Sequence, residues 1–322
     1  MLPTTTRRLV QAAASISVAL AVEACDGSGA TDDQAGDAGA AGGGSPAAPW
    51  LLVDADMGLD DARVLLALPM QGKFHVAGVV TVEGSAVASK GADNALRLLT
   101  AVGVESVPVA IGSQQTLDGQ AVPAPAWRTM AEGLGGLALP PSGRAPEPLS
   151  GPDFTVSILR ESPEPVYVLA IGPLTNLALA LDADPSLAGK IHSISVLGEF
   201  VACQDYNCAT DPAAAAAVLS SPVPVDMMVP SATDKVPFDA AFLGHVQSLT
   251  GPAGLLVAQI MAHHSDGYMK LWDDSVLEAL LAPELFTFQA VNDTERQTVD
   301  LQVAAVEQAL LDLWNTPVPT MP

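Results

Sequence analysis

The segment at residues 50–61, WLLVDADMGLDD, constrains the fold more than any other part of this chain. Its four leading residues are apolar or aromatic, and a short run of this kind is typical of a buried strand. The carboxylates that follow therefore lie at or just beyond the carboxyl end of that strand, which is the edge where open α/β sheets bind ligands. These carboxylates are Asp54, Asp56, Asp60 and Asp61.

Carboxylates packed this closely repel one another unless a cation joins them. Oxygen ligands of this hard type favour calcium or magnesium. The alternative is an acidic loop that caps the following helix, since Asp is favoured at helix N-caps and in first turns. A cap needs one or two acids rather than four, so the segment favours a metal site.

Strand-like and helix-like segments alternate along most of the remaining chain. The alternation implies an α/β fold with a largely parallel central sheet, helices on both faces and a site at the carboxyl ends of the strands. A Pro- and Gly-rich excursion at 114–148 carries little periodicity, and we expect it to form an insertion or a lid. The strand-like segments are 75–84, 107–112, 166–172, 194–198 and 223–230, and the helix-like ones include 61–70, 88–102 and 174–181.

The N-terminal residues are typical of an export signal. Two arginines precede an apolar stretch at 9–22, which is short for a membrane span and suits the core of a secretory signal. Residues 22–25, VEAC, resemble a bacterial lipoprotein cleavage box in which Cys25 is lipidated. Glu23 is unusual in such a box, so ordinary signal cleavage is one alternative, and a disordered apolar N-terminus is another.

Residues 25–48 are mostly Gly, Ala, Ser and Asp, and they predict a flexible tether because they offer little to bury. We therefore expect a signal peptide at 1–24, a tether at 25–48 and one domain at 49–322. Such a protein is exported by a bacterium and is either periplasmic or anchored as a lipoprotein. Its contact with a membrane would come only through lipid on Cys25, since no other segment is long and apolar enough to span one.

The net charge of −23 argues against a nucleic-acid partner, because phosphate binding needs a basic surface. The same charge favours solubility and attracts cations. Besides Cys25, the chain has Cys203 and Cys208, which flank QDYN. In an exported protein this spacing favours a disulfide, with two free thiols as the alternative. Two cysteines without a nearby His make a poor zinc site.

Several segments together resemble the inosine-uridine-preferring nucleoside hydrolase family over residues 49–315. The family's D-x-D-x-x-x-D-D segment stands intact in the acidic segment at 54–61. Haloacid-dehalogenase-type phosphatases also open with D-x-D after a strand, but they lack the later acid pair and usually have Thr or Val where Gly58 stands. Later matches are TVEGSAVASKGADNALRLL, LAIGPLTNLA at 169–178, DYNCATDPAAA at 205–215 and LWDDSVLEALLAPELF at 271–286.

The resemblance implies a nucleoside-hydrolase-like α/β fold with a bound calcium ion. Its ligands would be Asp56, Asp61, the Ile171 carbonyl and Asp273, with Asp54 and Asp60 supporting them from behind. Asp56 would be the general base for a water that the cation makes more acidic and that attacks C1′ of the ribose. The transition state would resemble an oxocarbenium ion. Without the resemblance, Asp273 could be a first-turn acid of a helix and Ile171 a buried strand end.

Two tryptophans bear on the base that the resemblance implies. Trp272 directly precedes Asp273, and Trp127 lies in a Pro-rich stretch after the third strand. Both places resemble the purine-specific subclass, which prefers inosine, adenosine and guanosine. The pair would stack on either side of a purine and help it leave without a protein acid. The alternative is that both tryptophans pack in the core or under a lid.

The ribose-binding positions depart from the family pattern. Ser85 stands where the family has Asn or Asp. The family's Glu before Phe-Asn is shortened to Asp205 before Tyr206, although Asn207 is kept. A Gly-rich segment that carries another ribose-binding Asn is missing, and the loop between the two cysteines takes its place. Loss of contacts to substrate hydroxyls changes discrimination strongly, so the substrate differs from a plain ribonucleoside or turnover is slow.

The favoured function is therefore an exported, calcium-dependent hydrolase of purine ribonucleosides. One alternative is a lipid-anchored protein that binds a nucleoside or sugar on the same fold with little turnover. Another is a hydrolase of a different N-riboside. Intact Asp56 favours an enzyme, whereas the altered Ser85 and Asp205 favour a binding protein. Family members are often dimers or tetramers, so a homo-oligomer is compatible with the resemblance.

Overall fold

The computed structural model describes residues 48–118, 123, 125–200, 202–262 and 270–318. The expected signal peptide at 1–24 and Cys25 lie outside these residues, as does the expected tether apart from its last position. Within the described part of the chain, no helix combines the length and apolar character that crossing a membrane requires.

The described residues build one eight-stranded sheet in the order β3-β2-β1-β4-β5-β6-β8-β7. All neighbouring strands pair in parallel except β7 and β8, which are antiparallel. The expected fold is thus confirmed. The strands are β1 (Trp50–Ala55), β2 (His75–Thr81), β3 (Val109–Ile111), β4 (Val166–Ala170), β5 (Ile191–Leu197), β6 (Val225–Met228), β7 (Phe286–Ala290) and β8 (Glu295–Leu301).

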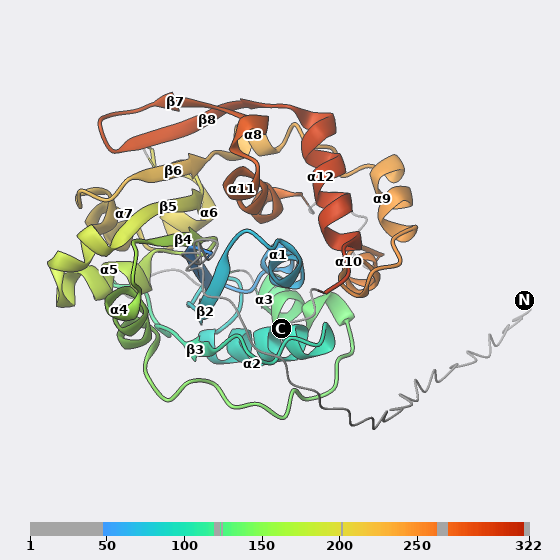
Figure 1. Ribbon diagram of the computed structural model, residues 1–322, viewed down its shortest axis with the longest axis horizontal. Coiled ribbons are helices and arrows are strands. Elements are labelled where there is room, and N and C mark those ends of the chain that lie inside the picture. The colour runs from blue at the N-terminus through green and yellow to red at the C-terminus, as the bar shows by residue number, and fades with distance from the viewer. Residues whose placement is uncertain (1–47, 119–122, 124, 201, 263–269, 319–322) are drawn as a thin grey trace, which may run out of the picture. The chain divides into compact units, whose positions relative to one another are not determined.

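Helices cover both faces of this sheet (Figure 1). The helices α4, α5 and α7 lie on one face, and α1, α2, α10, α11 and α12 lie on the other. The α-helices are α1 (Leu59–Ala67), α2 (Ala88–Ala101), α3 (Pro125–Glu132), α4 (Gly151–Glu161), α5 (Thr175–Ala183), α6 (Tyr206–Thr210), α7 (Pro212–Leu219), α8 (Pro230–Thr233), α9 (Ala240–Gln247), α10 (Pro252–Ala262), α11 (Trp272–Leu281) and α12 (Val303–Asn315). Short 3-10 helices are η1 (Leu68–Met70), η2 (Leu134–Gly136), η3 (Pro185–Lys190) and η4 (Pro283–Leu285).

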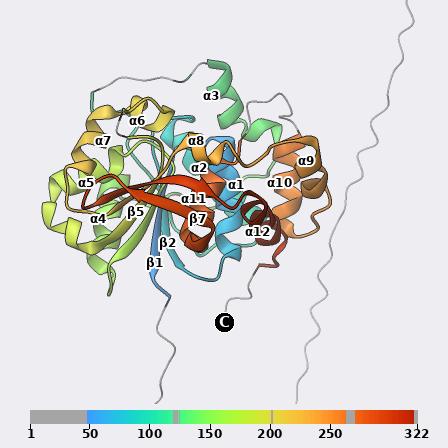
Figure 2. The ribbon, with the colours of Figure 1, turned by 90° about the horizontal axis from the view of Figure 1, so that it is seen from above.

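Strand β1 shows why the sheet needs both layers. Side chains alternate between the two faces of a strand. Leu51, Val53 and Ala55 are buried in the core beneath α1 and α2, whereas Leu52 is buried in the core beneath α4 and α5. A strand that is apolar on both faces is stable only at the centre of a covered sheet, so its last residues come to the middle of one edge. Seen from above, α3, α6 and α8 lie at that edge (Figure 2).

Two parts of the fold differ from the expected elements. The hairpin of β7 and β8 was not predicted, because β8 reads ERQTVDL and presents mostly polar side chains on a half-exposed strand. The excursion at 114–148 contains α3 and rejoins the sheet through a 2.8 Å hydrogen bond from the Glu147 amide to the Val109 carbonyl. It is therefore an insertion with a helix of its own, placed over the edge where the strands end.

Candidate active site

Asp54 lies inside β1 and contacts residues around the site rather than the cavity itself. Its Oδ1 accepts a hydrogen bond from Asn176 Nδ2 at 2.9 Å, and the same amide group also donates to the Thr81 carbonyl at 3.1 Å. Burial raises the pKa of Asp54 to about 8, although the hydrogen bond from Asn176 lowers it. Through Asn176, Asp54 thus connects the first turn of α5 to β1 and to the end of β2.

The turn after β1 is held by Asp61. Its Oδ1 accepts from the Asp56 amide at 3.1 Å, and its Oδ2 accepts from the Gly58 amide at 2.8 Å. Met57 between them has a φ of 63°, a left-handed conformation that non-glycine residues rarely adopt. A backbone held in this way at the end of a central strand is typical of functional sites. The turn keeps Asp56 and Asp61 side by side.

Asp56 is buried and is held by the loop that follows β2. Its Oδ2 accepts hydrogen bonds from the Ser85 amide at 2.8 Å and from Ser85 Oγ at 3.2 Å. Gly84 packs so tightly on this carboxyl group that a Cβ there would lie 2.2 Å from Asp56 Oδ2. Ser85, expected as a substrate-binding residue, therefore also orients Asp56. Burial raises the pKa of Asp56, while the hydrogen bonds from Ser85 lower it.

A group of three acids lies next to Asp56. One carboxylate oxygen each from Asp60, Asp61 and Asp273 lies within 4.8 Å of the others. Burial, followed by the charges of the neighbouring acids, raises the pKa of Asp61 and Asp273 well above the usual range. Burial also raises the pKa of Asp60 to about 6, although Arg63 lowers it. We expected Asp60 only as support, yet the structure brings it into the group.

The donor set fits a hard cation. Asp273 Oδ1 is buried and has no hydrogen-bond partner among the residues that the structure describes. A buried carboxylate oxygen without a donor is costly, and a cation among three such carboxylates removes that cost. Oxygen atoms alone are the ligands that calcium and magnesium prefer. Asp60, Asp61 and Asp273 are therefore the residues that would hold such an ion.

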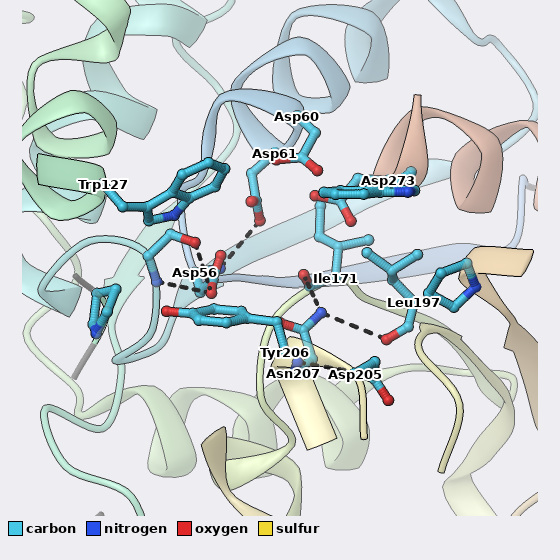
Figure 3. A pocket seen from close by; sticks show the side chains of 14 residues that line it. Asp56, Asp60, Asp61, Trp127, Ile171, Leu197, Asp205, Tyr206, Asn207 and Asp273 are labelled. Atoms are coloured by element: carbon cyan, nitrogen blue, oxygen red, sulfur yellow. Dashed lines mark hydrogen bonds between the residues drawn. The ribbon is translucent and has the colours of Figure 1, made fainter. Parts of the chain in front are cut away.

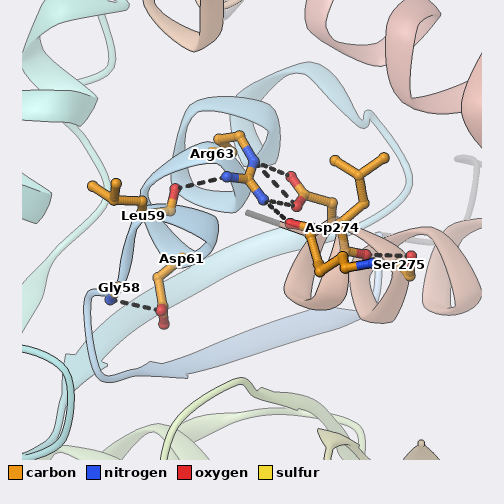
Figure 4. A network of polar contacts seen from close by, with 8 residues as sticks. Gly58, Leu59, Asp61, Arg63, Asp274 and Ser275 are labelled. Carbon is orange, nitrogen blue, oxygen red and sulfur yellow. Dashed lines mark hydrogen bonds and ion pairs between the residues drawn. The ribbon is translucent and has the colours of Figure 1, made fainter. Parts of the chain in front are cut away.

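A buried ion pair fixes the two helices that carry these acids (Figure 4). Arg63 of α1 is fully buried, and its Nη2 lies 2.5 Å from Asp274 Oδ2 on α11. Arg63 Nε donates to Asp274 Oδ1 at 3.1 Å, and Nη2 also donates to the Lys270 carbonyl at 2.6 Å. The pair holds α1 against the first turn of α11. We did not predict it, although a single Arg within the apolar run of α1 was a usable signal.

Asn207 and Asp205 shape the opposite wall. Asn207 Nδ2 donates to the Ile171 carbonyl at 3.0 Å, so this expected calcium ligand already accepts one hydrogen bond. Asp205 caps α6, because its Oδ1 accepts from the amides of Asn207 and Cys208, each at 3.1 Å. Its Oδ2 accepts from the Glu199 amide at 2.8 Å. Both carboxylate oxygens of Asp205 therefore bind backbone amides and fix the loop that forms this wall of the cavity.

A disulfide joins Cys203 and Cys208 and closes the loop that contains this wall. The bridged segment carries Asp205, Tyr206 and Asn207, all of which line the cavity. Tyr206 is 44% exposed, and we did not predict a role for it. An aromatic residue directly before the retained Asn was the available signal. The disulfide thus spans three neighbouring residues of the site.

The acids open into a cavity of about 450 Å³ (Figure 3). A cavity of this size suits a small organic ligand, since such sites usually enclose roughly 300–1,000 Å³. Trp127 of α3 and Trp272 of α11 both line it, as do Pro123 and Pro230. Figure 3 shows Trp127 and Tyr206 on opposite sides of Asp56 in this view. The expected acids other than Asp54, together with both tryptophans, therefore line one cavity.

A hydrogen bond to a residue that does not line the cavity fixes the Trp272 side chain. Its Nε1 donates to Asp234 Oδ1 at 2.8 Å, at the end of α8. The hydrogen bond orients the indole at the cavity, so packing in the core does not account for its position. Both indoles are partly exposed, as residues that contact a ligand must be.

Comparison with known proteins places this geometry among enzymes of one family. The model of the family described as inosine-uridine preferring nucleoside hydrolase matches residues 51–316. The chain is 32% identical over 252 residues to the pyrimidine-specific ribonucleoside hydrolase RihA of Citrobacter koseri, covering 74% of this chain and 80% of that protein. It is 30% identical over 281 residues to uridine nucleosidase 1 of Arabidopsis thaliana, covering 82% of this chain and 83% of the relative.

Solved structures share the fold. A plant nucleoside hydrolase superposes with a TM-score of 0.75 at 22% identity, covering 84% of this chain and 99% of the other. A purine-preferring ribonucleoside hydrolase from Gardnerella vaginalis superposes with a TM-score of 0.74 at 21% identity, covering 83% and 99%. The similarity therefore extends over almost the whole described domain and includes the strands that carry the acids.

Proposed function

Because this chain belongs to the inosine-uridine preferring nucleoside hydrolase family, we propose that it hydrolyses purine ribonucleosides with the help of a calcium ion. Hydrolysis of ribonucleoside N-glycosidic bonds is the activity that the family establishes. The calcium ion and the purine preference are the proposed parts. The observation that carries them is the group of Asp60, Asp61 and Asp273 beside Asp56, in a cavity bordered by two tryptophans.

The calcium ion would be held by the three grouped acids, with Asp56 and the Ile171 carbonyl close by. When bound, it would neutralise the carboxylates and increase the acidity of a neighbouring water molecule. Calcium suits the site better than zinc, because the donors are oxygen atoms only and calcium accepts many of them in a flexible arrangement.

The chain's own residues then account for the chemistry. Asp56 accepts a proton from the water as the water oxygen forms a bond to C1′ of the ribose. The bond between C1′ and the base nitrogen breaks, and its electron pair leaves with the base, which takes a proton from solvent. The two hydrogen bonds from Ser85 hold the Asp56 carboxylate in a fixed orientation during this step. The sugar carries oxocarbenium character in the transition state.

The purine preference rests on Trp127 and Trp272, both of which line the cavity. A bicyclic base offers each indole a larger stacking face than a pyrimidine does. Stacking also stabilises the departing base where no protein acid reaches it. The names of the two relatives describe pyrimidine and uridine hydrolases, so the preference of this chain has to be measured directly.

The test compares ribose release from inosine, adenosine, guanosine, uridine and cytidine by the purified protein, with calcium or with a chelator. We expect release that needs calcium and is faster from the purines. Faster release from uridine or cytidine would overturn the purine preference alone. Release that persists in chelator would overturn the role of the cation. Nucleoside binding without release would instead identify a binding protein, and release only from another N-riboside would redefine the substrate.

We also propose that the protein is exported and anchored by lipid on Cys25. The support is the sequence of residues 7–25 and the disulfide between Cys203 and Cys208, since disulfides persist in oxidising compartments.

A further inference from the structure

Arg128 of α3 forms a partly buried ion pair with Glu83, in the loop that follows β2. It follows Trp127 on α3, and its Nη2 donates to Glu83 Oε1 at 2.6 Å and to the Gly84 carbonyl at 3.2 Å. The Arg128 side chain is 15% exposed and that of Glu83 is 13% exposed. An ion pair shielded to this degree is screened less by salt than a surface pair.

The loop that contains Glu83 contacts Asp56, the proposed general base, directly. Glu83 and Gly84 immediately precede Ser85, which donates two hydrogen bonds to Asp56 Oδ2. The Ala86 amide also donates to the Asp56 carbonyl at 2.9 Å. The tight packing of Gly84 on the Asp56 carboxyl group leaves the loop no room to move toward it. A shift of Glu83 would therefore displace the donors that orient Asp56.

Helix α3 keeps a second attachment that does not involve Arg128. Glu132 Oε1 accepts from the Val87 amide at 3.3 Å, and the Glu132 carbonyl accepts from Asn94 Nδ2 at 3.0 Å. These contacts hold the end of α3 against α2. Removal of the Arg128 charge should therefore leave the helix attached and the protein folded, while it loosens the link between α3 and the loop.

We propose that Arg128 is a positioning residue that couples the tryptophan wall on α3 to the loop that orients Asp56. Through Glu83 and the Gly84 carbonyl, it sets the placement of Ser85 and Trp127 relative to each other. The inference rests on the proposed function, since it assigns Asp56 and Trp127 the roles given there. Its consequence is that one side chain affects both binding of the base and the chemical step.

The test uses Arg128→Met, Glu83→Gln, the double variant and Arg128→Lys in the purified protein. We expect Arg128→Met to lower kcat about tenfold or more and to raise KM, because small misplacements of reacting groups have effects of that size. The double variant should be no slower than Arg128→Met, since both changes break one pair. Arg128→Lys should recover part of kcat by keeping the charge.

Arg160→Met is the matched control. Arg160 also forms a 2.6 Å ion pair, with Asp184, but its side chain is 59% exposed and the pair lies outside the residues that line the cavity. Its kcat and KM should equal those of the unchanged protein. A loss of folded protein would lower kcat without changing KM, so the rise in KM separates positioning from general destabilisation.

Amide hydrogen exchange supplies a readout that needs no turnover. We expect exchange at residues 83–87 to be faster in Arg128→Met than in Arg160→Met, because the loop opens locally once its link is lost. Unchanged exchange there would overturn the inference even if the protein released no ribose. Unchanged kcat and KM, or fully additive effects in the double variant, would also overturn it. Absence of ribose release from the unchanged protein would count against the proposed function.

Discussion

At the scale of single residues, the two neighbouring acids Asp56 and Asp54 have separate tasks. Asp56 lines the cavity and accepts hydrogen bonds from Ser85, whereas Asp54 lies within β1 and is bound by Asn176. The difference arises because Asp54 lies inside β1, whereas Asp56 lies in the turn that follows the strand, next to Met57 with its left-handed backbone. The chemical step is therefore expected to depend on Asp56, and the stability of the fold on Asp54.

Replacement of Asp56 by Asn should lower kcat by about 10²–10⁴, the usual contribution of a general base. The amide oxygen can still accept the hydrogen bonds from Ser85, so the fold should persist. Ribose release and the thermal midpoint of unfolding check the two expectations. Asp300→Asn is the control, because Asp300 is exposed, forms an ion pair with Lys235 and does not line the cavity. Equal kcat in the two variants would remove Asp56 from the chemical step.

At the scale of elements, the site depends on the contact between α1 and α11. Residues with recognisable patterns could be placed from the sequence, including Asp61, Asp273 and Trp272. The sequence could not show that Arg63 and Asp274 would pair, because they lie 211 positions apart and periodicity records only local order. Nor could it show that both carboxylate oxygens of Asp205 would accept hydrogen bonds from backbone amides. The β7–β8 hairpin was missed because its polar strand lacks a continuous apolar run.

Asp273 and Asp274 are adjacent acids for which we expect opposite effects. Asp274→Asn leaves the charge of Arg63 buried and unpaired, which should reduce the free energy of unfolding by about 3–5 kcal/mol. Asp273→Asn relieves repulsion among the grouped acids, so it should stabilise the protein in chelator and weaken calcium binding. Denaturant unfolding and calcium titration calorimetry measure these effects. A loss of stability in both variants would argue against a cation site.

At the scale of the whole molecule, burial of so many acids links stability to pH and to cations. Burial raises the pKa of Asp54 to about 8 and that of Asp60 to about 6, and it raises the pKa of Asp61 and Asp273 well above the usual range. In the unfolded chain these groups ionise near pH 4. The folded protein therefore binds more protons than the unfolded one between about pH 4 and pH 8.

The metal-free protein should consequently lose stability as pH rises from about 5 to about 8, since the folded state holds the protons that the unfolded state releases. Calcium should reverse this loss by favouring the ionised folded form. Thermal midpoints measured across this range, with chelator and with excess calcium, check both statements. A metal-free midpoint that rises with pH would show that the carboxylates are ionised without a cation.

The proposed anchor gives a separate expectation for the whole chain. Expression in a bacterium should place the protein in the membrane fraction, and Cys25→Ser should move it to the soluble exported fraction, because a thioether-linked lipid needs the thiol. Fractionation followed by mass spectrometry of the N-terminal peptide measures this. An unmodified Cys25 in a soluble protein would leave ordinary signal cleavage as the explanation.

The distance along the chain between the two halves of the acidic group also has a consequence for how the protein matures. Asp61 follows the first strand in the chain, whereas Asp273 follows the sixth. Contacts this remote in sequence are made late in folding. A ribosome must therefore release nearly the complete domain before the three acids can come together, so the proposed calcium ion would bind only the folded domain and would slow its unfolding.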